Sequence, residues 1–126
     1  MTKQPKRILL VEDDNFLRRA CEASLRKGGF TVVTAENGEK AVEQALAQPP
    51  HLVLLDLLLP KMSGIDVLRV LRKTEHTRDI PVFILSNSSR EADRVEAERL
   101  GVSGYFVKAN MSLRELGRHV ERILEK

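Results

Sequence analysis

Short apolar runs and amphipathic segments alternate along the chain. Five runs rich in Leu, Ile and Val span residues 7–12, 30–35, 51–56, 80–86 and 104–108. The segments between and after them carry apolar residues at helical spacing and span residues 15–29, 38–48, 64–73, 89–101 and 112–126. Near-continuous apolar runs are typical of strands buried on both faces of a sheet, and strands that alternate with helices pair in parallel with right-handed crossovers. The pattern therefore predicts a single α/β domain of five βα units.

Polar residues at three of the predicted helix starts indicate caps. Ser88 with Glu91, and Ser112 with Glu115, have the three-residue spacing of a capping box. Asp14 precedes the first helix, and we expect it to cap that helix through backbone amides rather than to bind a metal. These caps fix where three of the helices are expected to begin.

Length and composition narrow the class of protein. A chain of 126 residues with 42% hydrophobic and 31% charged residues fits one folded globular domain. No apolar stretch reaches the roughly 18 residues that a membrane span needs, and acids follow the first apolar run too closely for a signal peptide. Cys21 is the single cysteine, so an internal disulfide is excluded. Together these features favour a cytoplasmic protein that does not act in a membrane.

The positive net charge does not by itself indicate a nucleic-acid partner. The formal net charge is +3 and the pI is about 9.2, but the bases are spread among acids. The one local basic cluster consists of Lys3, Lys6 and Arg7, which we interpret as a solvated N-terminus rather than a DNA-binding arm. Four Phe and one Tyr leave no stacking platform for bases. We therefore expect no direct contact with nucleic acid.

Chemically useful side chains follow the predicted strands at the point where each strand ends. In open α/β sheets, ligands bind at the carboxyl ends of the strands. The polar residues at these ends are Glu12, Asp13, Asp14, Asp56, Ser86 and Lys108. Each alone has an ordinary explanation, such as an ion pair between Asp56 and Lys108. Their coincidence at one edge of the sheet indicates a functional site.

Clustered carboxylates at this edge point to a divalent cation. Two carboxylates about 4 Å apart repel by roughly 4 kcal/mol at an effective dielectric constant near 20, so either a pKa rises or a cation lies among them. Oxygen ligands suit Mg²⁺, which keeps several waters and accepts phosphate oxygens. No His or Cys cluster suits zinc, because His51, His76 and His119 are scattered and are interpreted as surface residues. Mg²⁺ is therefore the expected cofactor.

The same set of groups suits phosphoryl transfer. An aspartate can act as a nucleophile and become an aspartyl phosphate. Mg²⁺ and Lys108 would balance charge on the equatorial oxygens of the phosphoryl group, while Ser86 would donate a hydrogen bond to one of them. These residues therefore suit phosphoryl transfer onto one of the strand-end aspartates.

Four segments, taken in order, resemble motifs of a known family. The segments ILLVEDD, LVLLDLLLPKMSG, IPVFILS and GYFVK are similar to those of receiver domains of two-component response regulators, of the kind found in chemotaxis regulators. The resemblance extends along nearly the whole chain. It implies a single (βα)5 doubly wound parallel five-stranded sheet of flavodoxin-like order 2-1-3-4-5. It also implies that residues 1–126 form the receiver domain, without an output domain in this chain.

The resemblance implies roles for the strand-end residues. Asp56 would be the phosphoacceptor, and Lys108 would pair with the phosphoryl group. Asp13 would bind Mg²⁺ directly, while Glu12 would act largely through metal-bound water. Asp56 and the backbone carbonyl of Leu58 would complete the protein ligands. The domain would catalyse only its own phosphorylation and dephosphorylation, and would not be an enzyme acting on other substrates.

The resemblance also implies a switch and partners. The phosphoryl donor would be a phosphohistidine on a sensor histidine kinase or on a histidine phosphotransfer protein. Ser86 would move toward the phosphoryl group, and Tyr105 would then rotate inward. This would alter the face formed by residues 89–101, 104–108 and 112–126, which controls a partner or forms a homodimer.

Two surface features bear on this switch. The predicted helix at residues 89–101 is charged around most of its surface, and its few apolar anchors, Val95 and Leu100, predict loose packing suited to a mobile element. On the last helix, Arg114, Arg118 and Arg122 lie at spacing four. We interpret them as a solvated stripe, with pairing to acids of a dimer mate or partner as the alternative.

The sequence departs from the family after the lysine and after the switch hydroxyl. Ala109 stands where the family has a proline whose peptide bond is commonly cis. Because a cis non-proline bond costs about 3 kcal/mol, the Lys108–Ala109 bond is either strained cis or part of a rearranged trans loop. We expect cis, since the lysine must still reach the phosphoryl group. Asn87 replaces a small residue and is positioned to crowd the phosphate entrance.

A third departure concerns hydrolysis of the phosphoryl group. Leu58 lies two residues beyond Asp56, and Ser88 lies two residues beyond Ser86. In the family, these two positions flank the water that hydrolyses the phosphoryl group. An apolar Leu58 hinders that water, so we expect a phosphoryl lifetime of minutes or longer.

Three other classes fit the sequence less well. An aspartyl-phosphate phosphatase usually needs a second Asp two residues after the first, where Leu58 stands here, and it would carry a cap domain. A flavin-binding module would have a Ser/Thr/Gly-rich phosphate loop after the first strand, where this chain has the acidic EDDNF. A DNA-binding protein would show a recognition helix or a basic face, and neither is visible.

Overall fold

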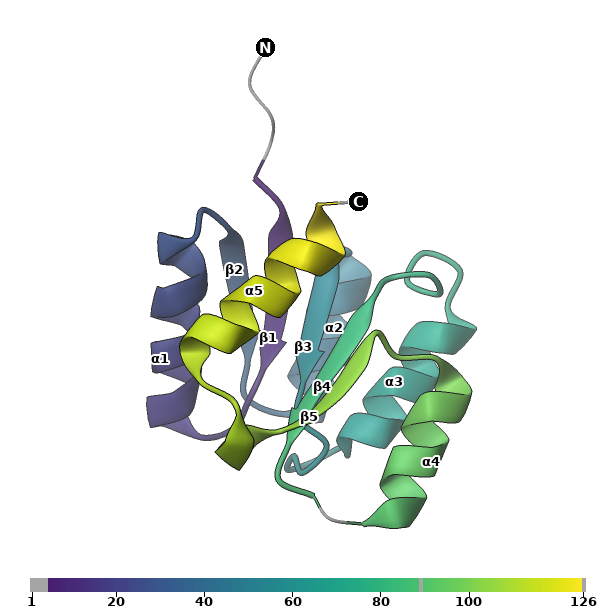
Figure 1. The fold of residues 1–126 in the computed structure, drawn as a ribbon. Helices are drawn as coiled ribbons and strands as arrows, with labels where there is room; N and C mark the ends of the chain where they lie inside the picture. Colours follow the sequence, from purple (N-terminus) through teal and green to yellow (C-terminus); the bar gives the residue numbers. More distant parts are fainter. Residues whose placement is uncertain (1–4, 89, 126) are drawn as a thin grey trace.

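The computed structural model describes residues 5–88 and 90–125. Within these residues, five parallel strands form one sheet in the order β2-β1-β3-β4-β5 (Figure 1). The strands are β1 (Arg7–Val11), β2 (Thr31–Ala35), β3 (Leu52–Leu55), β4 (Val82–Ser86) and β5 (Gly104–Val107). The predicted parallel five-stranded sheet and its order are therefore confirmed.

Helices cover both faces of the sheet. Within the described residues they are α1 (Asn15–Lys27), α2 (Gly38–Ala47), α3 (Gly64–Lys73), α4 (Glu91–Leu100) and α5 (Leu113–Leu124), with a 3-10 turn η1 (Lys108–Asn110). α1 and α5 pack on one face, and α2, α3 and α4 pack on the other (Figure 1). Each predicted segment contains the observed element, and the ends differ by no more than a few residues.

The apolar runs fill two cores, one on each face of the sheet. In β1, Ile8 and Leu10 face the layer of α1 and α5, whereas Leu9 and Val11 face the layer of α2, α3 and α4. All four are at most 3% exposed. Because successive side chains of a strand point to opposite faces, a strand covered on both sides is apolar at every position. Each such side chain contributes about 1.5–3 kcal/mol on burial.

Two of the three predicted caps are present. The Asp14 carboxylate accepts a hydrogen bond from the Leu17 N–H at 2.8 Å at the start of α1. At the start of α5, Ser112 and Glu115 form the complete capping box. Both helices therefore begin where the sequence indicates, and Asp14 uses one oxygen for capping.

The predicted capping box at Ser88 and Glu91 is wrong. Arg90 occupies the N-cap position of α4, and no side chain caps this end. The Ser88 hydroxyl instead donates to the Asp93 carboxylate at 3.2 Å. The helix begins after an extended residue 90, so Ser88 lies too far ahead of it to be the N-cap.

α4 has even fewer apolar anchors than the sequence predicts. Val95 is 55% exposed and is not an anchor, which corrects the prediction. Within α4, all of whose residues are described, the buried side chain is that of Ala97, and Leu100 packs partly against the core. A single buried methyl group contributes little hydrophobic stabilisation, so polar contacts must help to hold this helix.

Arginines of α3 form an ion pair and hydrogen bonds with the C-terminal half of α4. The Glu96 carboxylate pairs with Arg69 of α3 at 3.1 Å and with Arg99 at 2.7 Å. Arg72 of α3 donates to the carbonyls of Leu100 and Gly101 at 3.0 and 2.7 Å. α4 is thus fixed at its C-terminal end by charged groups, while its N-terminal end lacks a side-chain cap.

Two of the three histidines are surface residues, as expected. His51 and His76 are exposed, and His51 Nδ1 accepts the Arg7 N–H at 2.9 Å. His119 is half-buried, with its ring centroid 4.6 Å from that of Phe106, so its interpretation as a surface residue is wrong. The aromatic ring rather than solvent covers one face of this imidazole.

Two further findings bear on the sequence predictions. In the part of the chain that the structure describes, no helix has the length and apolar character needed to cross a membrane.

Within the predicted basic cluster, Lys3 lies outside the described residues. The Arg7 guanidinium donates to the Pro49 carbonyl at 2.8 Å and is therefore part of the fold.

The ion pairs of Glu96 predict a pH-dependent stability. Hydrogen bonds from Arg99 and Arg69 lower the pKa of Glu96 to about 2, from 4.5. A carboxyl whose folded pKa is depressed stabilises the fold above its unfolded pKa and loses that contribution as the pH falls toward its folded pKa. We therefore expect Glu96→Gln to lower the free energy of unfolding at neutral pH, and the deficit to shrink as the pH falls below about 4.5. Urea unfolding of the wild type and of Glu96→Gln across this pH range measures the difference in free energy of unfolding.

Glu98→Gln is the matched control for this experiment. The Glu98 carboxylate lies 3.9 Å from Arg94 and is 60% exposed, so its removal should change stability little at any pH. A deficit for Glu96→Gln that stays constant between neutral and acidic pH would contradict the role assigned to this ion pair.

Candidate functional site

The carboxyl ends of four strands meet at one edge of the sheet. The register pairs Val11 of β1 with Leu55 of β3. At the other side of the sheet, it pairs Ser86 of β4 with Val107 of β5. The residues that follow the strands therefore lie side by side at this edge. They are Glu12, Asp13, Asp56, Asn87 and Lys108.

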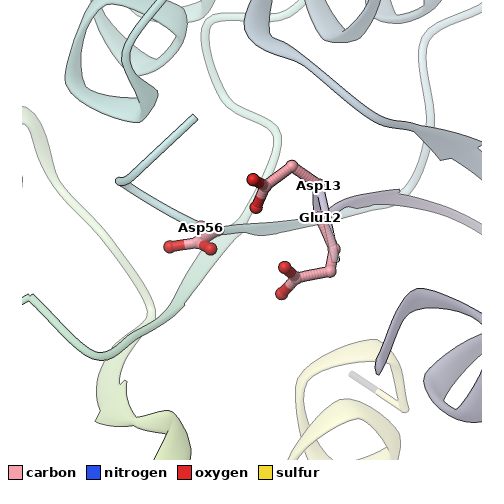
Figure 2. Close-up of side chains that lie close together, drawn as sticks. All are labelled: Glu12, Asp13 and Asp56. Atoms are coloured by element: carbon pink, nitrogen blue, oxygen red, sulfur yellow. The ribbon is translucent and has the colours of Figure 1, made fainter. Parts of the chain in front are cut away.

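Three of these residues form an acidic cluster. Glu12, Asp13 and Asp56 each offer a carboxylate oxygen within 4.8 Å of the others, and Figure 2 shows the three carboxylates gathered around one point. Glu12 and Asp56 are each only 4% exposed, whereas Asp13 is exposed. Glu12 is therefore not an ordinary surface residue. Repulsion of about 4 kcal/mol per close pair requires compensation.

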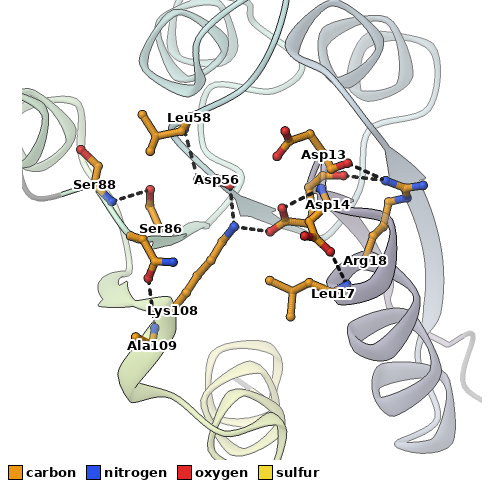
Figure 3. Close-up of polar contacts among 12 residues, drawn as sticks. Asp13, Asp14, Leu17, Arg18, Asp56, Leu58, Ser86, Ser88, Lys108 and Ala109 are labelled. Carbon is orange, nitrogen blue, oxygen red and sulfur yellow. Dashed lines mark hydrogen bonds and ion pairs between the residues drawn. The ribbon is translucent and has the colours of Figure 1, made fainter.

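Lys108 supplies this compensation. Its Nζ lies 2.6 Å from Glu12 Oε1 and 2.7 Å from Asp56 Oδ2 (Figure 3). Burial alone would lower the pKa of the Lys108 ammonium, but its hydrogen bonds to Asp56 and Glu12 outweigh burial and raise that pKa. The lysine therefore remains charged at neutral pH and bridges the two buried carboxylates.

Backbone amides bind the remaining oxygens of the two buried carboxylates. Glu12 Oε2 accepts the Asp14 N–H at 3.0 Å, and Asp56 Oδ1 accepts the Leu58 N–H at 3.1 Å. Burial raises the pKa of Glu12, against the opposing hydrogen bonds from Lys108 and from the Asp14 N–H. These contacts fix the orientation of both carboxylates before any ligand binds.

Two residues that shape the site were not identified from the sequence. Arg18 donates to the Glu12 carbonyl at 3.0 Å and so holds the loop between β1 and α1. Gly64 begins α3 directly against the backbone of Asp56 and Leu57, where an added Cβ atom would overlap both. The Gly in SGID after the acidic strand end is a signal for such a close approach, whereas nothing local marks Arg18.

Lys108 reaches Asp56 from a trans loop. None of the peptide bonds within the described residues is cis, so the expectation of a cis Lys108–Ala109 bond is wrong. Residues 108–110 form the 3-10 turn η1 instead. A trans bond avoids the cost of about 3 kcal/mol for cis geometry at a non-proline residue, and the lysine still reaches the carboxylates. The Ala109 N–H donates to Asn87 Oδ1 at 3.1 Å.

The predicted switch residues lie beside this cluster on the side of α4. Ser86 is fully buried, and its Oγ accepts the Ser88 N–H at 3.2 Å (Figure 3). The Tyr105 hydroxyl is buried without a hydrogen-bond partner among the described residues. The Arg94 guanidinium lies 5.1 Å from the centre of the Tyr105 ring. Burial, reinforced by the charge of Asp93, raises the pKa of Tyr105.

The acidic cluster fits Mg²⁺ rather than a softer metal. Its donors are all carboxylate oxygens, and one of them, from Asp13, is exposed and accessible to a hydrated ion. Mg²⁺ prefers few protein oxygens and keeps several waters, whereas zinc prefers nitrogen and sulfur ligands. The Leu58 N–H is part of the site, while its carbonyl as a ligand remains a prediction.

Comparison with known proteins identifies the class. The family model "Response regulator receiver domain" matches residues 8–121. The receiver domain of sensor histidine kinase PA1611 from Pseudomonas aeruginosa PAO1 superimposes with a TM-score of 0.87, covering 98% of this chain and 100% of that one at 30% identity. That structure contains a magnesium ion coordinated in its active site cleft.

Curated relatives agree with this class. The alkaline phosphatase synthesis transcriptional regulatory protein PhoP of Bacillus subtilis is 34% identical over 96% of this chain and 49% of its own length. The phosphate regulon transcriptional regulatory protein PhoB of Escherichia coli is 36% identical over 96% of this chain and 52% of its own length. This chain thus spans about half the length of these relatives. It belongs to the receiver domain family of two-component response regulators, and the resemblance seen in the sequence is confirmed.

The cluster predicts that Mg²⁺ stabilises the folded protein and that Asp13 is needed for this effect. A ligand that binds only the native state raises the free energy of unfolding, by about 2.7 kcal/mol when its concentration is about 100-fold above Kd. Because Asp13 is exposed and lacks a bond to Lys108, Asp13→Asn should retain the fold and abolish the gain from Mg²⁺. In EDTA it should raise the stability, because it removes a repelling charge from the cluster. Urea unfolding with and without MgCl₂ measures both quantities.

Asp14→Asn is the matched control, since Asn caps helices as well as Asp does and Asp14 is outside the cluster. It should retain the full gain from Mg²⁺. An equal gain in wild type and Asp13→Asn would contradict the assignment of the metal site.

Proposed function

We propose that this domain accepts a phosphoryl group on Asp56 from a phosphohistidine, in a Mg²⁺-dependent reaction. The donor would be a sensor histidine kinase or a histidine phosphotransfer protein, and the reaction would take place in the cytoplasm. The observation that carries the proposal is the contact of Lys108 Nζ with Asp56 Oδ2 at 2.7 Å, next to the acidic cluster. A buried aspartate paired with a lysine and flanked by metal-binding carboxylates is suited to in-line phosphoryl transfer.

The transfer forms one bond and breaks another. An Asp56 carboxylate oxygen attacks phosphorus, the P–O bond forms, the P–N bond to the histidine breaks, and the leaving imidazole nitrogen takes up a proton. Lys108 then pairs with the negative phosphoryl oxygens, and the Ser86 hydroxyl donates a hydrogen bond to one of them. Bound Mg²⁺ would supply neutralisation of the charge on the transferring group.

Glu12, Asp13 and Asp56 would hold the metal. The exposed Asp13 would bind it directly, Glu12 would act largely through metal-bound water, and the Leu58 carbonyl would complete the set. The cluster geometry supports this assignment for the three acids. Lys108 bridges Glu12 and Asp56 without a metal, so metal binding would share the neutralisation of charge with the lysine.

The phosphoryl group would switch the face formed by α4, β5 and α5. It adds a charge of roughly −1.5 to −2 at the edge of the sheet, and Ser86 would turn toward it. Tyr105 would then occupy the space that Ser86 vacates. Weak apolar anchoring of α4 supports a pre-existing equilibrium that phosphorylation shifts.

This face would contact a partner or a second copy of the domain. Val95 of α4 and Val107 of β5 are exposed apolar residues on it. The arginines of α5, at positions 114, 118 and 122, are exposed and form no ion pair within the described residues. They support docking of acidic groups, but a solvated stripe remains the simpler interpretation. We propose no contact of this domain with nucleic acid or membrane.

Phosphorylation of Asp56 is tested with a small-molecule phosphodonor. Incubation with phosphoramidate and Mg²⁺ should add one phosphoryl group per chain, as measured by intact-protein mass spectrometry. Asp56→Asn should remove the modification, because an amide is not a nucleophile toward phosphorus, while the fold is retained. Label that persists in Asp56→Asn, or repeated turnover of phosphodonor without retained label as in a phosphatase, would contradict the proposal.

The phosphoryl lifetime tests the role of Leu58. Its side chain is 53% exposed at the rim of the site and would hinder the approach of the hydrolytic water. We expect a lifetime of minutes or longer, and we expect Leu58→Asn to shorten it several-fold because an amide can orient water. Decay of the label after removal of the phosphodonor measures both. Loss within seconds from the wild-type protein would refute this role.

A further inference from the structure

Asn87 connects the end of β4 to the residue that follows Lys108. Its Oδ1 accepts the Ala109 N–H at 3.1 Å. A backbone N–H can only donate, so the oxygen of the Asn87 amide must face it. Ala109 follows Lys108 directly, within the turn η1 (Figure 3).

The contact begins where the pairing of β4 with β5 ends. The last pair in the register is Ser86 with Val107, so the next residues on the two strands are Asn87 and Lys108. β5 is an edge strand with one neighbour, and no further backbone ladder holds the chain beyond Val107. Beyond this pair, the hydrogen bond between the Asn87 side chain and the Ala109 N–H connects the two segments.

The position of the Lys108 backbone matters because its side chain is long and flexible. The Lys108 ammonium lies 2.6 and 2.7 Å from two buried carboxylate oxygens. Backbone motion at residue 108 would lower the fraction of molecules in which the ammonium contacts both oxygens. On the far side, the Met111 N–H donates to the Lys108 carbonyl at 3.2 Å. Together with the Asn87 contact, it fixes the peptide units that follow the lysine.

We propose that Asn87 is a positioning residue for Lys108 and acts through the Ala109 N–H. Asn87 and Ala109 therefore depend on each other, since a proline at position 109 would have no N–H to donate. The inference rests on the proposed function only where it concerns the rate of phosphoryl transfer. The positioning of Lys108 itself is measurable in the unphosphorylated protein.

A double-mutant cycle tests this coupling. Rates of phosphorylation by phosphoramidate are compared for wild type, Asn87→Ala, Ala109→Pro and the double variant at saturating Mg²⁺. Because the contact is exposed to solvent, Asn87→Ala should slow the reaction by only about 2- to 10-fold. We expect this loss to outweigh any gain from a wider phosphate entrance at position 87. In the Ala109→Pro background, Asn87→Ala should have no further effect. In the Ala109→Ser background, which keeps the N–H, it should have its full effect.

The same variants are examined by NMR without phosphodonor. Asn87→Ala should accelerate hydrogen exchange at the Ala109 amide but not at the Met111 amide, and it should speed the exchange of the Lys108 ammonium protons with water. An Asn87→Ala effect on rate that is equal in all three backgrounds, or unchanged exchange at Ala109 and Lys108, would overturn the inference. If wild type takes up no phosphoryl group, the proposed function fails and the NMR comparison still decides the role of Asn87.

Discussion

The Lys108 ammonium holds the functional edge of the sheet together by bridging Glu12 and Asp56. Two buried carboxylates at this distance cannot both remain charged without a cation, and the lysine provides one at 2.6 and 2.7 Å. The bridge joins residues that follow β1, β3 and β5, so it depends on the parallel register of the whole sheet. Conversely, the exposed Asp13 leaves one side of the cluster open, and we propose that Mg²⁺ and the phosphoryl group enter there.

The proposed phosphoacceptor is held firmly, whereas the helix proposed to move on phosphorylation, α4, is weakly anchored. The Asp56 carboxylate is fixed by Lys108 and by the Leu58 N–H. α4, in contrast, fully buries only the methyl group of Ala97 among its described residues, and Leu100 packs partly against the core. Ion pairs of Glu96 and hydrogen bonds from arginines of α3 hold its C-terminal half. Charged contacts of this kind contribute less than apolar packing. The weak anchoring of α4 therefore supports the proposal that phosphorylation shifts its position.

Much of the fold and of the site could be predicted from the sequence, because the strands are apolar on both faces and the polar residues start where the strands stop. Features that depend on contacts between distant segments could not be predicted. Ser88 has the spacing of a capping box, but Asp93 competes for its hydroxyl. Val95 is apolar, yet it points to solvent. The bond before Ala109 is trans because no proline follows Lys108, and the resemblance to a family with a cis proline there led to the wrong prediction. Arg18 acts through a backbone carbonyl, so no local pattern reveals its role.

A crystal structure with Mg²⁺ and beryllofluoride, which mimics an aspartyl phosphate, tests the central claim most directly. The account predicts beryllium bonded to an Asp56 oxygen, Lys108 Nζ within hydrogen-bond distance of a fluoride, and Mg²⁺ bound to Asp13 and Asp56. A structure in which Lys108 turns to solvent while the mimic is bound, or in which the mimic bonds elsewhere, would contradict it.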